Sequence, residues 1–158
     1  MGNMFAGSEI VEMGIQIEKN GRDFYNELVN KSKDQKAKEI FKYLAEEEEK
    51  HIAVFQNILD SVRKYKPIEA YPGEYFAYMN ALASEYVFTQ KDKGQETARN
   101  TKNDMEVVEL GIKLEKDSII FYESMKKAVP EHGHKVIDSL IEQEQNHLTR
   151  LSDLKKKL

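Results

Sequence analysis

Two Glu-x-x-His motifs in this chain have the residue types and the spacing needed to bind metal ions. Glu48 and His51 form the first motif, and Glu144 and His147 form the second. Residues three positions apart lie on one face of an α-helix, so each pair could hold one ion. Carboxylate and imidazole ligands suit iron, manganese or zinc. The motifs therefore predict a metal centre.

An internal repeat relates the two motifs and extends over both flanking segments. Residues 9–28 match residues 106–125 at an offset of 97, and residues 44–51 match residues 140–147 at an offset of 96. Packing alone could preserve the apolar matches, but it gives little reason to preserve polar ones. The chain therefore contains two copies of one helical hairpin. Identical pairs include Glu9/Glu106, Val11/Val108, Gly14/Gly111, Glu18/Glu115, Tyr25/Tyr122, Leu44/Leu140, Glu48/Glu144 and His51/His147.

Glu18 and Glu115 lie where helical periodicity predicts the core. Each interrupts a stripe of apolar residues, as Glu18 does between Ile15 and Tyr25. The Glu-x-x-His motifs interrupt similar stripes, in which apolar residues recur at intervals of three and four. Charged residues at such positions call for an explanation beyond packing. The stripes with the motifs are Phe41, Leu44, Glu48, His51, Phe55 and Ile58, and Ile137, Leu140, Glu144, His147, Leu151 and Leu154.

Four carboxylates and two imidazoles would thus converge on one bundle interior. Burying an unpaired carboxylate is costly, and no lysine or arginine occupies these stripe positions. Two divalent cations would balance the negative charge. One glutamate from each of two helices and Glu-x-x-His from each of two others is the ligand pattern of di-iron and di-manganese carboxylate bundles. The predicted metal ligands are Glu18, Glu48, His51, Glu115, Glu144 and His147.

The run of four glutamates before His51 requires a choice of ligand. His51 could pair with Glu48, three positions earlier, or with Glu47, four positions earlier. In the second copy, His147 has a glutamate three positions earlier but Gln143 four positions earlier. The repeated ligand is therefore Glu48.

Long helices must position these residues. Ser8 is expected to cap the first helix, and Asn103 or Asp104 the third long one. Alternating apolar and polar runs are rare, so the fold class is all-α. The polar residues 90–104 are expected to form a loop, with turns at 72–73 and 132–134. The expected helices cover about 9–30, 34–64, 74–88, 104 to before Pro130, and 135–157.

The arrangement expected from these elements is a four-helix bundle. Helical hairpins at about 8–64 and 104–157 would be joined by one long crossover, from about Ser61 to Asp104, that contains the short helix. A bundle with one long crossover has ferritin-like connectivity. The 158 residues are expected to form one domain, 1–158.

Composition narrows the possible chemistry and partners. The chain has no cysteine, which excludes disulfides, thiol catalysis and cysteine-bound metals, and it has 4 histidines. Its net charge of −4 gives no reason to expect nucleic-acid binding. Neither a targeting segment nor a membrane-spanning apolar run is evident. A cytoplasmic location without membrane association is expected.

The ligand set resembles that of the ferritin-like superfamily, and most closely the rubrerythrin di-iron family, over nearly the whole chain. The resemblance implies two iron ions bridged by Glu48 and Glu144. Glu18 and Glu115 would be terminal ligands, together with the two histidines of the motifs. It also implies that the diferrous centre reacts with peroxide or dioxygen, which makes all six ligands catalytic.

Two departures from rubrerythrins have consequences for function. Full-length rubrerythrins carry a four-cysteine rubredoxin domain, whereas this chain has no cysteine. An external electron donor, rubredoxin-like or a flavoprotein, is therefore expected. Rubrerythrins also have an extra glutamate ligand where this chain has Ser118. The site is thus expected to be more symmetric, as in bacterioferritin-type ferroxidase centres.

Several alternatives remain open at the level of sequence. Manganese or zinc could replace iron, and the protein could bind or handle iron without turnover. Tyr25 and Tyr122 could hydrogen-bond to ligand carboxylates or simply fill the core. His132 and His134 are expected in a solvated loop, with a surface metal site as the alternative. A homodimer is expected, and the crossover would cover the bundle or join the dimer interface.

Overall fold

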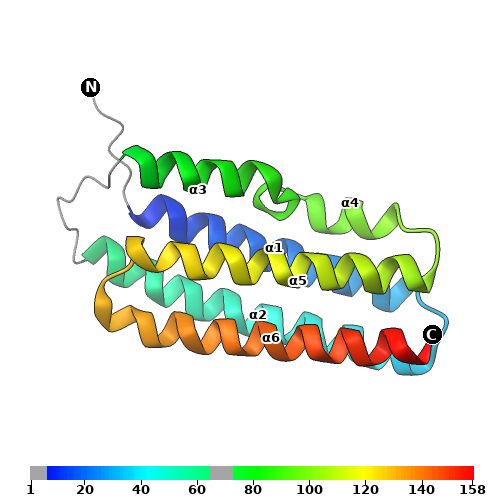
Figure 1. Ribbon diagram of the computed structural model, residues 1–158. Coiled ribbons are helices and arrows are strands. Elements are labelled where there is room, and N and C mark those ends of the chain that lie inside the picture. The colour runs from blue at the N-terminus through cyan, green and yellow to red at the C-terminus, as the bar shows by residue number, and fades with distance from the viewer. Residues whose placement is uncertain (1–6, 65–72) are drawn as a thin grey trace.

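The computed structural model describes residues 7–64 and 73–158, and all regular secondary structure within them is helical (Figure 1). The all-α prediction is therefore confirmed. The α-helices are α1 (Gly7–Lys31), α2 (Gln35–Lys64), α3 (Gly73–Glu85), α4 (Lys93–Arg99), α5 (Asp104–Met125) and α6 (His134–Lys157). Short 3-10 helices are η1 (Val87–Thr89), η2 (Lys126–Ala128) and η3 (Glu131–Gly133).

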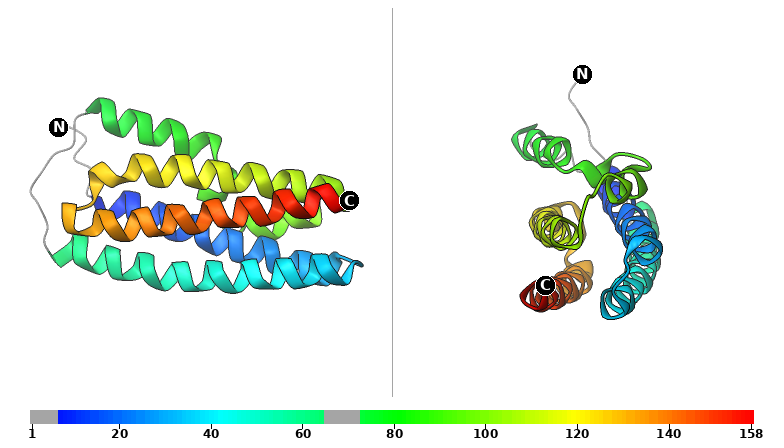
Figure 2. Two further views of the ribbon diagram at one scale, coloured as in Figure 1. Left: turned by 60° about the horizontal axis from the view of Figure 1, so that its bottom comes forward. Right: turned by 90° about the vertical axis from the view of Figure 1, so that its right-hand side faces the viewer.

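Two helical hairpins form the bundle. The first hairpin, α1 with α2, packs beside the second hairpin, α5 with α6, and the four helices run along a common axis (Figures 1 and 2). The crossover lies along one side of this bundle, where α3 packs against α5 and α4 packs against α1. The predicted four-helix bundle with one long crossover is confirmed.

Polar side chains cap two of the helix starts. The Glu106 amide donates to Asn103 Oδ1 at 2.8 Å, which confirms the predicted cap of α5. The Ala37 amide donates to Asp34 Oδ2 at 3.1 Å, a cap that was not predicted from the sequence. The Ser8 prediction is wrong, because α1 begins at Gly7 and Ser8 lies within its first turn. The predicted end of the second helix before Pro67 and the turn residue Pro72 lie outside the described residues.

The loop predicted over residues 90–104 is wrong in its middle, where α4 forms. Ala98 of this helix is fully buried, and the Gly94 amide donates to the Asn20 side chain at 3.0 Å. A β-carbon on Gly94 would lie only 1.9 Å from the Asn20 carbonyl oxygen, so glycine permits the close approach to α1. Tertiary contacts with α1 stabilise this short helix, whose own sequence lacks an apolar stripe.

Aromatic side chains pack on both sides of the bundle centre. Tyr25 stacks on Phe41 with ring centroids 6.3 Å apart, and Tyr122 contacts Phe55 at 4.9 Å. All four rings are buried. They enclose the polar centre described below. None of the described helices is long and apolar enough to cross a membrane.

Candidate metal centre

The four long helices carry all six predicted ligands into the middle of the bundle. Glu18 on α1 has no exposed surface, and Glu115 on α5 is 3% exposed. The motif residues of α2 and α6 are equally buried, with exposed fractions between 1% and 4%. Their arrangement follows from the interrupted stripes, because each stripe faces the bundle axis.

The six side chains form two overlapping groups whose possible ligand atoms lie within 4.8 Å of one another. Glu48 and Glu144 belong to both groups. The first group, position A, consists of Glu18, Glu48, His51 and Glu144. The second group, position B, consists of Glu48, Glu115, Glu144 and His147.

Both histidines direct Nδ1 toward the carboxylates. His51 Nδ1 lies 3.0 Å from Glu144 Oε1 and 3.4 Å from Glu18 Oε2. His147 Nδ1 lies 3.1 Å from Glu48 Oε1, 3.2 Å from Glu144 Oε2 and 3.6 Å from Glu115 Oε1. The two imidazole rings stack with centroids 5.5 Å apart. One nitrogen of each ring is thus placed to bind an ion among the carboxylates.

The two tyrosines hydrogen-bond to ligand carboxylates across the repeat. Tyr25 on α1 donates to Glu115 Oε1 of α5 at 2.6 Å, and Tyr122 on α5 donates to Glu18 Oε1 of α1 at 2.6 Å. Both tyrosines therefore hydrogen-bond to ligand carboxylates and do not simply fill the core. Each tyrosine fixes the glutamate supplied by the other hairpin, and hydrogen bonds to ligands orient metal sites in this way.

Tyr86 and Gln143 also contact the centre or its immediate support, and sequence reasoning missed both roles. Tyr86 comes from the crossover and its hydroxyl lies 2.7 Å from Ser118 Oγ, one turn along α5 from Glu115. No helical periodicity in the crossover singles out this residue. Gln143 Oε1 lies 2.7 Å from His51 Nε2. In the sequence, Gln143 indicates only that Glu48 rather than Glu47 is the repeated ligand.

Gly21 provides room for a ligand in the first hairpin. A β-carbon at Gly21 would lie 2.8 Å from Glu48 Oε2, so a larger residue would displace that carboxylate. Ser118 occupies the matching position in the second hairpin. There its hydroxyl bonds to Tyr86 and to the Leu114 carbonyl oxygen, at 2.7 and 3.0 Å.

The buried carboxylates have strongly perturbed pKa values. Burial and the charges of Glu144 and Glu18 raise the pKa of Glu48 well above its usual range. Burial and the charge of Glu144 raise the pKa of Glu115 to about 8. Burial would also raise the pKa of Glu18, but the hydrogen bond with Glu48 and the charge of His51 outweigh burial and lower it.

The histidines and tyrosines respond to the same negative charges. Burial opposes the charged form of His51, but the charge of Glu18 and the hydrogen bond with Glu144 raise its pKa to about 12. The nearby carboxylates of Glu115, Glu144 and Glu48 likewise outweigh burial and raise the pKa of His147. Burial raises the pKa values of Tyr25 and Tyr122, so both phenols remain protonated donors.

The donor set fits a pair of divalent cations. Within residues 7–64 and 73–158, the four buried carboxylates form ion pairs only with His51 and His147, without lysine or arginine. Glu18 Oε2, Glu48 Oε1, Glu144 Oε2 and both ring nitrogens of His147 have no hydrogen-bond partner. Buried polar atoms without partners are costly, and metal ligation would satisfy them.

The other two histidines lie away from this centre. His132 is exposed and its Nε2 lies 3.1 Å from Ser61 Oγ, whereas His134 is half-buried, with Nε2 2.8 Å from the Lys126 carbonyl oxygen. Neither belongs to a potential metal group among the described residues. His132 is exposed to solvent, as predicted, whereas His134 is the first residue of α6 and does not lie in a loop.

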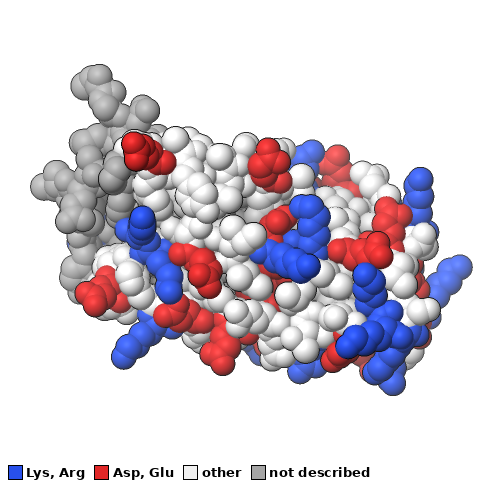
Figure 3. All heavy atoms as spheres, in the orientation of Figure 1, with Lys and Arg blue, Asp and Glu red and all other residues white. Residues whose placement is uncertain are grey.

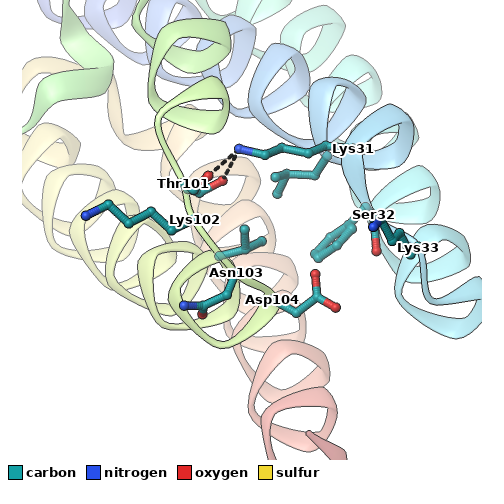
Figure 4. A pocket seen from close by; sticks show the side chains of 10 residues that line it. Lys31, Ser32, Lys33, Thr101, Lys102, Asn103 and Asp104 are labelled. Carbon is teal, nitrogen blue, oxygen red and sulfur yellow. Dashed lines mark hydrogen bonds between the residues drawn. The ribbon is translucent and has the colours of Figure 1, made fainter.

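A separate cavity of about 480 Å³ opens at the end of the bundle where α1 meets the segment before α5 (Figure 4). Lys31 reaches across its edge and donates to Thr101 Oγ1 at 3.0 Å. Asp104 is the one carboxylate among the described lining residues, and no imidazole joins it. The cavity therefore lacks the donors of the candidate metal centre.

On the face of the molecule in Figure 3, acidic and basic side chains are interspersed along the described part of the bundle. Ion pairs at the described surface include Arg22–Glu49 and Lys113–Asp117, at 2.8 and 2.7 Å. Pairs of this kind contribute little stability because water screens them.

Comparisons with known proteins agree with this geometry. The rubrerythrin family model matches residues 9–155. A crystal structure from Thermotoga maritima, provisionally described as a ferritin-like diiron-carboxylate protein, is 25% identical with a TM-score of 0.67. The match covers 99% of this chain and 98% of that one. No protein with a curated functional description matches significantly. The extent of the family match shows that the chain belongs to the rubrerythrin family.

Proposed function

We propose that this protein is a di-iron carboxylate oxidoreductase that reduces hydrogen peroxide or dioxygen. The observation that carries the proposal is the buried cluster of four carboxylates and two imidazoles, with Glu48 and Glu144 shared between positions A and B. When bound, two ferrous ions would supply two electrons, enough to reduce one peroxide with two protons to two waters.

The side chains of this chain would bind and orient the two ions. Glu18 and His51 would complete position A, and Glu115 and His147 would complete position B. Glu48 and Glu144 would contribute to both positions. Tyr25 and Tyr122 would hold the terminal glutamates through their 2.6 Å hydrogen bonds. The surrounding apolar core would keep bulk water from the reacting ions.

Turnover also requires a source of electrons. These 158 residues contain no cysteine to bind a rubredoxin-type iron, and we propose a rubredoxin-like protein or a flavoprotein as the donor. Two such chains would associate as a homodimer. Donor binding is testable by following oxidation of a reduced rubredoxin or flavin in the presence of iron-loaded protein and peroxide.

The decisive experiment is anaerobic Fe²⁺ loading followed by stoichiometric addition of hydrogen peroxide. Metal analysis is expected to give about two irons per chain. Oxidation of both irons should consume one peroxide, faster than with the same concentration of free Fe²⁺. Two bound irons that consume peroxide only at the free-iron rate would support iron handling without turnover. Failure to bind metal under iron-replete conditions would overturn the metal centre itself.

A further inference from the structure

Gln143 determines which nitrogen of His51 is available to a metal. The Gln143 side-chain oxygen lies 2.7 Å from His51 Nε2. An amide oxygen can only accept a hydrogen bond, so Nε2 must carry the proton and donate. The opposite nitrogen, Nδ1, then faces Glu144 and Glu18 inside the centre. A neutral His51 therefore presents its lone pair to position A.

The orientation of the Gln143 amide is itself supported. Its Nε2 donates to Ser139 Oγ at 3.3 Å, one turn earlier on α6. The amide nitrogen is thus directed toward Ser139 and the amide oxygen toward His51. The chain Ser139–Gln143–His51 connects the partly exposed outer side of α6 to the buried metal position.

His147 lacks an equivalent support from the first hairpin. Glu47, on α2, occupies the position that matches Gln143 at the repeat offset of 96. Its carboxylate instead accepts a hydrogen bond from Tyr43 at 3.1 Å and pairs with Lys50 at 3.1 Å. His147 Nε2 is buried and has no hydrogen-bond partner among the described residues.

Contact with Tyr43 places the His147 ring but does not fix its protonation. The Tyr43 and His147 rings are nearly perpendicular, at 82°, with centroids 6.3 Å apart, and Arg150 lies over the Tyr43 ring at 4.4 Å from its centroid. Such packing restricts rotation of the imidazole without a hydrogen bond to select a tautomer. Position A is therefore prepared for metal binding in a way that position B is not.

We infer that the two metal positions are unequal, that position A fills first, and that Gln143 is the positioning residue responsible. The inference rests on the proposed metal centre and adds the order in which its positions fill. Outer partners of metal-bound histidines fix ring orientation and tautomer, and their loss typically lowers metal affinity about 10- to 100-fold.

The test compares Gln143→Leu, Gln143→Glu and the matched control Gln145→Leu with the wild-type protein. Gln145 is an exposed residue two positions along the same helix, so its replacement tests the general effect of removing an α6 amide. Anaerobic Co²⁺ titrations against a competing chelator give two stepwise affinities, and cobalt absorption bands report each position. Zinc-loaded protein with ¹⁵N-labelled histidine shows by NMR which ring nitrogen binds metal.

We expect the wild-type protein to bind its first Co²⁺ at least tenfold more tightly than its second. Gln143→Leu should weaken the first step about 10- to 100-fold and leave the second unchanged. Gln143→Glu keeps an acceptor and should retain the tight step, as should Gln145→Leu. The NMR spectrum of the wild-type protein should show His51 bound through Nδ1 and protonated at Nε2.

Three results would overturn the inference: equal stepwise affinities in the wild-type protein, an unchanged first step in Gln143→Leu, or metal bound through His51 Nε2. A wild-type protein that binds no divalent metal would instead overturn the proposed function. Thermal unfolding of each metal-free variant shows whether it is folded. If Gln143→Leu does not fold, Gln143→Glu tests the same inference.

Discussion

The two hairpins supply matching ligands to one centre but differ in the residues that support those ligands. Each contributes a glutamate from its first helix, a Glu-x-x-His motif from its second, and a tyrosine that reaches the other hairpin. The two copies are therefore identical at every candidate ligand and at the tyrosine that supports it.

One difference between the hairpins lies where the crossover packs. In the first hairpin, the buried Asn20 donates to the carbonyl oxygens of Phe88 and Gln90, each at 2.6 Å, and accepts from Gly94. Its repeat partner Asp117 lies near the surface and pairs with Lys113. One hairpin is thus anchored to the crossover by a buried amide, and the other has a solvent-facing charge at the same position.

The largest expected effect on metal content distinguishes a ligand shared by both positions from a ligand of one position. Glu48→Ala removes a donor common to positions A and B and should reduce bound iron from about two ions to near zero. Glu18→Ala affects position A alone and should leave about one ion. Metal analysis after anaerobic loading and gel filtration measures both, with Glu46→Ala as the exposed control. Equal losses in the two variants would contradict the sharing of Glu48.

Removing either tyrosine hydroxyl should lower metal affinity at the position whose glutamate that tyrosine holds. Tyr122→Phe deprives Glu18 of its hydrogen bond and should lower affinity at position A, whereas Tyr25→Phe should lower affinity at position B through Glu115. Losses of about 10-fold or more are expected for such supporting bonds. Stepwise Co²⁺ titration measures them. The crossed relation fails if each variant weakens the position of its own hairpin.

The anchor on the first hairpin can be tested with one added methyl group. Gly94→Ala places a β-carbon against the Asn20 backbone and should destabilise the protein by about 1–3 kcal/mol, the usual cost of overpacking. Gly73→Ala is the matched control, because a β-carbon there meets no atom of the described residues within 4 Å. Urea unfolding of the metal-free proteins measures the difference. Equal midpoints would show that α4 does not require this close approach.

The last test concerns the pH dependence of the metal-free protein. Glu115 has a pKa of about 8 in the folded state, above the ordinary 4.5 expected when unfolded. The folded state therefore holds this proton more tightly, and the resulting stability is complete below pH 4.5 and lost as the pH rises toward 8. His51 acts in the same direction, because its pKa rises from 6.5 to about 12.

Thermal unfolding in chelator should thus show a melting temperature that falls between pH 6 and pH 9. Each proton bound more tightly by the folded state contributes a slope of about 1.4 kcal/mol per pH unit. Glu115→Gln should reduce the slope, whereas replacement of the exposed Glu109 by glutamine should not. A melting temperature that rises over this range would contradict the raised pKa values. Bound metal should oppose the fall, because it replaces protons at the ligands.

Local patterns in the sequence were sufficient to predict the four long helices and the six residues that meet between them. Helical periodicity places Glu18, Glu48 and His51 on core-facing stripes, and the repeat supplies the same information a second time. The repeat also selected Glu48 over Glu47, and the structure buries Glu48 and leaves Glu47 partly exposed. The helix α4 was not predictable in this way, because contacts with α1 rather than an apolar stripe stabilise it.

The sequence by itself determined which residues face the centre, because a charged residue within an apolar stripe is a local signal. Only the tertiary structure decided their partners. Glu115 is 90 positions after Tyr25 in the sequence, and Gln143 is 92 positions after His51. Such contacts depend on how the hairpins and the crossover pack, and no spacing within a single helix encodes them. The same ligands therefore repeat in both hairpins, whereas packing between distant segments makes their two surroundings different.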